Sequence, residues 1–144
     1  MSFSTVVTLA EQVLSHLGID PKTACVRSDP DTVAWGMKRG SAQVLFIVAE
    51  EPKTGVWLRA IAPVVKVPAD AAKKLELYGR LLDLNAKAMR NAAFGVLNDN
   101  VVVVSERPAA GLDAAEAEQI LKHVGATADH YDDLLANELG LTRV

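Results

Sequence analysis

The sequence contains a single cysteine among its 144 residues, so no intrachain disulfide can form. Cys25 lies between Ala24 and Val26 in a run typical of a strand, and we interpret it as a buried structural thiol rather than an exposed reactive one. No stretch approaches the ~20 apolar residues of a membrane span, and no basic segment precedes an apolar run at the N-terminus. These absences predict a cytoplasmic protein without membrane contact.

The usual motifs of catalysis and cofactor binding are also missing. There is no cysteine pair, His-Glu-x-x-His sequence, phosphate-binding glycine loop, dinucleotide fingerprint or nucleophile elbow. His123 and His130 would lie roughly 10 Å apart on one helix, too far to share an ion. His130 and Asp133 could reach one ion, but we favour a solvated acidic face there. We therefore predict no metal, no cofactor and no enzymatic activity.

Aromatic residues are few, and two of them deserve comparison with nucleic-acid-binding proteins. Trp35 and Trp57 fall in alternating segments typical of strands, near Lys38, Arg39 and Arg59. Either indole could stack on a base beside these cations. Core or interface packing is the interpretation that we favour.

The net charge is also low, at −3, but the charged residues are unevenly distributed. Residues 71–92 carry five Lys/Arg against two Asp/Glu, whereas residues 93–144 carry three against nine. This distribution argues against a nucleic-acid footprint over the whole protein and leaves one basic helix face as an alternative. The length and the 50% of hydrophobic residues predict one domain, residues 1–144.

The hydrophobic pattern present in the chain predicts an α+β fold. Helices are expected at residues 4–17, 71–91 and 113–139, the last with a bend near Gly125. Strands are expected at residues 24–27, 32–37, 43–48, 56–67 with a bulge near Pro63, 93–97 and 101–105. Short hairpin connections at residues 38–41 and 98–100 predict an antiparallel sheet of five to six strands with three helices, in the order α-β-β-β(-β)-α-β-β-α.

The helix at residues 71–91 is the most informative segment, because it is apolar on two sides. One stripe comprises Leu75, Tyr78, Leu82 and Met89, and the other comprises Leu77, Leu81, Leu84 and Ala88. A surface helix normally has one such stripe, so this helix must be covered from two directions. The second cover is either another helix of the chain or a second subunit, and we favour a homodimer.

We expect the first stripe to face the sheet and the second to face a partner. The predicted dimer or partner interface consists of Leu77, Leu81, Leu84, Ala88 and Asn85. Asn85 lies between the stripes, where a polar side chain can set the register of packing. The predicted core consists of Leu9, Val13, Phe46, Val48, Leu75, Leu82, Phe94, Val102 and Leu121.

The second half of the chain resembles a known family. The matching segments are Leu81-Leu82-Asp83-Leu84-Asn85, Ala93-Phe94, Val101-Val102-Val103-Val104, Leu112-Asp113, Ala128-Asp129 and Leu134-Leu135. This succession resembles the YbjN-like family of bacterial sensory-transduction regulators. The order of elements also resembles that of the type III secretion chaperones, which have the CesT-like fold.

The resemblance implies a homodimer that holds protein clients without ATP, and it supplies no catalytic residues. Asn85 and Asp129 match the family pattern, but no chemistry is attached to either. We therefore expect a non-catalytic dimeric protein-binding module with a chaperone-like or regulatory role and an unidentified protein partner. The alternative is a nucleic-acid-associated factor that uses the basic residues of the helix at 71–91, which are Lys73, Lys74, Arg80, Lys87 and Arg90.

Overall fold

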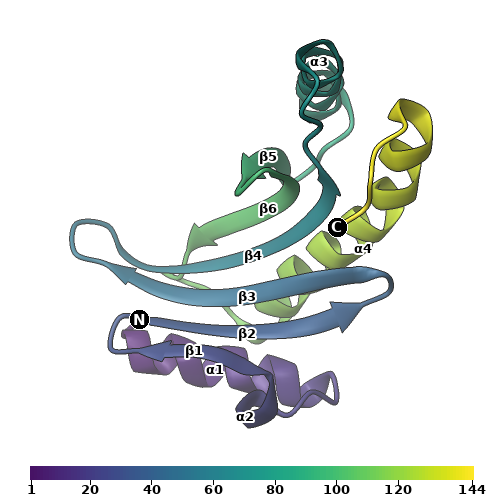
Figure 1. Cartoon of the computed structure of the whole chain (residues 1–144). Helices are drawn as coiled ribbons and strands as arrows, with labels where there is room; N and C mark the ends of the chain where they lie inside the picture. Colours follow the sequence, from purple (N-terminus) through teal and green to yellow (C-terminus); the bar gives the residue numbers. More distant parts are fainter.

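A curved six-stranded antiparallel sheet, with strand order β1-β2-β3-β4-β6-β5, forms the centre of the molecule (Figure 1). The computed structural model describes every residue from Met1 to Val144. The strands are β1 (Cys25–Asp29), β2 (Thr32–Arg39), β3 (Ala42–Glu51), β4 (Gly55–Lys66), β5 (Ala93–Leu97) and β6 (Asn100–Pro108). The predicted antiparallel sheet is confirmed, and the β4 bulge lies between Pro63 and Val65 as expected.

Four helices accompany the sheet: α1 (Phe3–His16), α2 (Pro21–Ala24), α3 (Ala71–Lys87) and α4 (Ala114–Leu139). The sequence predicted three, because the single turn of α2 is too short to show apolar periodicity. Each helix begins at a side chain that accepts a backbone N–H: Ser2, Asp20, Asp70 and Asp113. Asp113 and Glu116 form the reciprocal capping box that opens α4. None of the helices is long and apolar enough to cross a bilayer.

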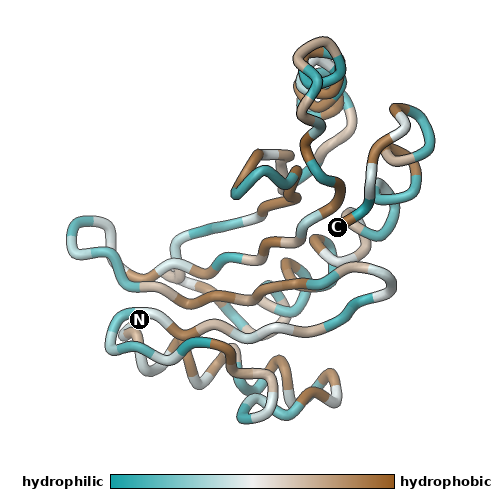
Figure 2. Tube along the Cα trace, viewed as in Figure 1, coloured by the Kyte–Doolittle hydropathy of each residue, from teal (hydrophilic) through white to brown (hydrophobic).

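The core lies between one face of the sheet and helices α1 and α4. Along β3, Val44, Phe46 and Val48 are buried, whereas the residues that alternate with them are less covered. Helices α1 and α4 pack against β3, and α4 also packs against β4 and β6. Hydrophobic residues accordingly line the central strands in Figure 2. Trp35 is 1% exposed and lies 6.3 Å from Phe46, which confirms core packing for this tryptophan.

Helix α4 runs through Gly125 as one continuous helix. Gly125 is buried against β2, where a Cβ atom would lie 2.9 Å from the Cβ of Arg39. Its role is therefore to allow close approach of the helix to the sheet.

Helix α3 projects from one end of the sheet instead of lying on it (Figure 1). Its inward side carries Leu77, Leu81 and Leu84, which are 0–7% exposed, whereas Leu75 and Leu82 are 75% and 69% exposed. The prediction that Leu75 and Leu82 belong to the core was wrong. Periodicity shows which residues share a face, but two equally apolar stripes do not show which one faces the core.

Two smaller expectations also need correction. Leu9 packs against the core but is only half-buried. Cys25 is half-buried instead of buried, because it begins the edge strand β1, where no further strand covers it. Its Sγ–H donates to the Arg27 carbonyl at 3.4 Å.

The turn between β2 and β3 is tied to α4 by acidic side chains. The Ser41 hydroxyl donates to the carboxylate of Asp129 and approaches that of Asp132 at 2.5 Å, and the Ser41 backbone N–H donates to Asp129 at 2.8 Å. These bonds from Ser41, the hydroxyl first, hold the pKa of Asp129 below its ordinary value, and the positive charge of Arg143 adds a smaller effect.

Replacing Phe46 by Ala should destabilise the protein by about 3–5 kcal/mol, because it opens a cavity in the core. The adjacent Leu45 points to the other face of β3 and is 39% exposed. Leu45→Ala should therefore cost about 1 kcal/mol or less. Urea unfolding of both variants measures the loss in the free energy of unfolding. Equal losses in the two variants would contradict the assignment of the core to the face of β3 that carries Phe46.

Ser41→Ala should raise the pKa of Asp129 toward its ordinary value, because the hydroxyl donor is lost. The folded-state pKa of Asp129 lies below its unfolded value of about 3.9. The ionised carboxylate of Asp129 therefore stabilises the fold at pH values above the unfolded-state pKa. This stabilisation is lost as the pH falls through the folded-state pKa. The stability gap between wild type and variant should narrow as the pH falls from about 5 to about 2. Carboxyl NMR titration of Asp129 measures the cause directly, and an unchanged pKa would contradict it.

Candidate functional site

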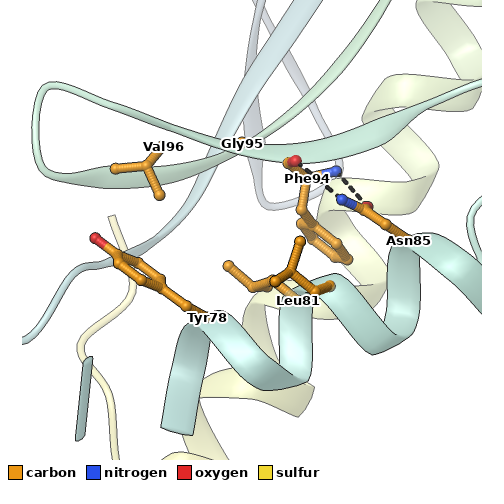
Figure 3. A pocket seen from close by; sticks show the side chains of 7 residues that line it. Tyr78, Leu81, Asn85, Phe94, Gly95 and Val96 are labelled. Carbon is orange, nitrogen blue, oxygen red and sulfur yellow. Dashed lines mark hydrogen bonds between the residues drawn. The ribbon is translucent and has the colours of Figure 1, made fainter. Parts of the chain in front are cut away.

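An apolar pocket of about 340 Å³ lies between α3 and the edge strand β5 (Figure 3). Its lining comprises Tyr78, Leu81, Leu82, Asn85, Phe94, Gly95 and Val96. Leu81 and Phe94 are almost fully buried, whereas Leu82 and Val96 are exposed at 69% and 47%. The pocket therefore has a closed apolar floor and an open apolar rim.

Asn85 fixes the geometry of this pocket. Its side-chain carbonyl accepts the Phe94 N–H at 2.7 Å, and its amide nitrogen donates to the Phe94 carbonyl at 3.2 Å (Figure 3). Because β5 is the last strand of the sheet, one of its edges has no strand partner. Asn85 pairs with this edge as a neighbouring strand would, and it holds α3 at a fixed distance from β5.

Exposed apolar side chains continue from the pocket over the surface. Leu75 lies one turn before Tyr78 on α3 and is 75% exposed. Leu97 is also exposed, but as the residue after Val96 in β5 it points to the opposite face of the strand. We call Leu75, Leu82 and Val96 the apolar rim. The consecutive apolar residues Val96 and Leu97 were a sequence signal for exposed apolar surface on β5, because they point to opposite faces and only one of the two can reach the core.

The structure divides the predicted interface residues into three groups. Leu77, Leu81 and Leu84 are buried within the chain itself, so the expectation that they face a partner needs correction. Asn85 is half-buried and bonded to β5, and Ala88 is exposed at the end of α3. Only Leu81 and Asn85 line the pocket, where they form part of its floor. The rim residues Leu75 and Leu82 come from the stripe that was assigned to the core.

Acidic partners reduce the positive charge of α3. Arg80 pairs with Glu138 of α4 at 3.0 Å, and Lys87 pairs with Asp83 at 2.8 Å. The Arg80 pair also holds α3 against the end of α4. Lys73 and Lys74 of α3 form no ion pair, and neither does Arg90, which lies beyond the end of the helix at Lys87. A nucleic-acid contact in this region would depend on these three residues.

The other residues considered for chemistry lie apart from the pocket. The carboxylate of Asp133 pairs with Arg143 at 2.8 Å, whereas the His130 ring packs edge-on against Tyr131. Trp57 is half-exposed, and its Nε1–H donates to the Thr54 hydroxyl at 2.9 Å.

The described residues contain no group of three or more His, Cys, Asp or Glu side chains arranged for a metal ion.

Comparison with known families identifies the fold. The family model described as T3SS (YopN, CesT) and YbjN peptide-binding chaperone 1 matches residues 7–143. The chain belongs to this family. The match confirms the resemblance to YbjN-like proteins and covers both elements that line the pocket. No curated protein matches the chain by sequence.

Three solved structures share the chaperone fold. The ExsC–ExsE complex aligns with a TM-score of 0.68 at 19% identity, over 94% of this chain and 97% of the other. The HopA1–SchA chaperone–effector complex gives 0.60 at 12% identity, over 89% and 93%. The Yersinia pestis type III secretion chaperone SycH, in complex with a fragment of YscM2, gives 0.53 at 12% identity, over 84% and 94%. These matches confirm the predicted similarity to type III secretion chaperones at the level of the fold.

Within this chaperone fold, we predict that Asn85→Ala loosens α3 from β5. The substitution leaves the N–H and carbonyl of Phe94 without their partners, which should cost about 1–3 kcal/mol. Asn137→Ala is a matched control, because Asn137 is exposed on α4 and its side chain makes no hydrogen bond. Denaturant unfolding gives the stability loss, and amide exchange at Phe94 reports the local opening. Unchanged exchange at Phe94 in Asn85→Ala would show that this pair does not hold α3.

Proposed function

We propose that the protein is a non-catalytic, dimeric peptide-binding chaperone. Membership of a family of peptide-binding chaperones supports the binding of peptides or unfolded segments. The observation that carries the dimer is the apolar rim beside the pocket of α3 and β5. An exposed apolar patch of this kind on a soluble protein usually marks an interaction site.

A second copy of the chain is the occupant that we propose for the pocket. The rim leucines project beside a hollow floored by Leu81 and Phe94, so one face carries both a ridge and a groove. A two-fold interface needs such a self-complementary face, because every residue is used twice. Each leucine withdrawn from water contributes roughly 1.5–3 kcal/mol. The rim can therefore offset much of the entropy cost of association.

Leu75→Asp and Leu82→Asp should convert the dimer to a folded monomer, because both side chains are exposed in the single chain. Val26→Asp is the control, since Val26 is 64% exposed on β1, at the opposite end of the sheet from β5. Light scattering should give twice the single-chain mass of 15.4 kDa for wild type and Val26→Asp, and the single mass for the other two. A wild-type mass of one chain at micromolar concentration would exclude the dimer.

Peptide binding is tested separately from dimerisation. A phage-displayed library of random short peptides, selected on the immobilised wild-type protein, should yield an enriched pool. The same pool should compete with an unfolded model substrate for binding to the protein. Failure to enrich any pool would refute the peptide-binding function, whatever the oligomeric state.

A further inference from the structure

One edge of the second half of β4 pairs with residues that lie far from it in the sequence. The ladder between β3 and β4 ends where Leu45 lies opposite Ile61, so residues 62–66 have no partner in β3. Residues 142–144 pair with this part of β4 instead, and Arg143 lies opposite Val65 (Figure 1). The segment at 142–144 therefore fills an edge of the sheet that would otherwise present unpaired backbone groups.

Two backbone hydrogen bonds hold this segment in an antiparallel arrangement. The Lys66 N–H donates to the Thr142 carbonyl at 2.8 Å, and the Val144 N–H donates to the Val64 carbonyl at 3.2 Å. Together they show that an extended backbone fits the edge of β4. We call this edge the β4 slot.

The turn after α4 directs residues 142–144 toward the β4 slot. Gly140 has a positive φ of 65°, and the N–H groups of Gly140 and Leu141 both donate to the Ala136 carbonyl. This arrangement reverses the chain at the end of the helix, and a residue with a Cβ atom would be strained there. The reversal places the following residues alongside β4.

Two ion pairs of Arg143 also hold residues 142–144 in place. The Arg143 guanidinium contacts Asp132 at 2.9 Å and Asp133 at 2.8 Å. Asp132 is 4% exposed and is also approached by the Ser41 hydroxyl. The slot is thus flanked by carboxylates, which recognise a basic side chain at the position of Arg143.

The segment itself buries little surface. Thr142, Arg143 and Val144 are all exposed, whereas Val64 and Val65 of the slot are 0–1% exposed. Segments with few buried apolar contacts open at a low free-energy cost compared with the core. A longer extended chain that pairs with β4 can therefore compete with residues 142–144 for the same backbone groups.

We propose that the β4 slot is a binding site for an extended segment of a partner protein carrying an Arg or Lys, and that residues 142–144 occupy it as an internal competitor. The proposal rests on the proposed peptide-binding function and names the place and chemistry of the contact. The partner strand runs antiparallel to β4, and its basic side chain replaces Arg143 between Asp132 and Asp133. Binding then requires that the internal segment leave the slot.

A reversible disulfide tests the proposal in the full chain. Val65 and Arg143 lie directly opposite each other, and the hydrogen bonds on either side belong to their neighbours. Such non-hydrogen-bonded pairs bring Cβ atoms close enough for a disulfide. The variant Val65→Cys/Arg143→Cys is made with Cys25→Ser, which removes the native thiol. Oxidation should lock the segment in the slot, and reduction should release it.

The probe is a phage-displayed library of random short peptides, selected on the reduced variant. The selected pool should be enriched in Arg and Lys, and its affinity should fall about tenfold or more on oxidation. Cys25→Ser alone should bind the pool equally with and without reductant. Arg143→Ala, which removes the ion pair without any disulfide, should bind the pool more tightly than wild type.

The outcomes separate the two proposals. If a pool is selected but binds the oxidised and reduced variants equally, or binds Arg143→Ala no more tightly than wild type, the slot proposal is overturned while peptide binding stands. If no pool is enriched on wild type or on any variant, the peptide-binding function fails, and the slot proposal fails with it. Circular dichroism of each variant in both redox states verifies that the fold is intact.

Discussion

Burial of one face of the sheet is the constraint on which the rest of the structure depends. Phe46, Trp35 and Leu58 on that face are 0–1% exposed, and α1 and α4 supply the cover. Helix α3 adds Leu77, Leu81 and Leu84 to the same core. It takes a place at the end of the sheet, where it protects one edge and leaves an apolar side uncovered. The candidate interaction surface is thus a consequence of how the core is closed.

The attachment of α3 combines apolar and polar contacts. Leu77, Leu81 and Leu84 provide the buried contact, and the Asn85 side chain adds two bonds to the backbone of Phe94. Apolar contact alone tolerates sliding, whereas an amide paired with one residue of β5 does not. The two bonds of Asn85 therefore help to hold α3 in the position that puts Leu81 in the pocket floor and Leu82 on its rim.

Helix α4 uses its acidic residues to hold other parts of the chain. Glu118 contacts His16 of α1 at 2.6 Å, Asp132 contacts Arg143, and Glu138 contacts Arg80 of α3. The hydrogen bond from His16 also lowers the pKa of Glu118, together with that from Lys122. These pairs are mostly at the surface, where each contributes little to stability. Their common effect is to orient α1, α3 and the segment at 142–144 around one helix.

The sequence by itself determined the strands, the three long helices, the antiparallel sheet and the family, because alternation, helical spacing and capping residues act locally. It also identified Asn85 and both stripes of α3. Only the tertiary structure decided that Leu77 faces inward and Leu75 outward, since the two stripes are equally apolar and the choice depends on where the helix is placed. The pairing of residues 142–144 with β4 was likewise decided in three dimensions, because it depends on where β3 diverges from β4, a property of the curved sheet that leaves no periodic signal in the chain.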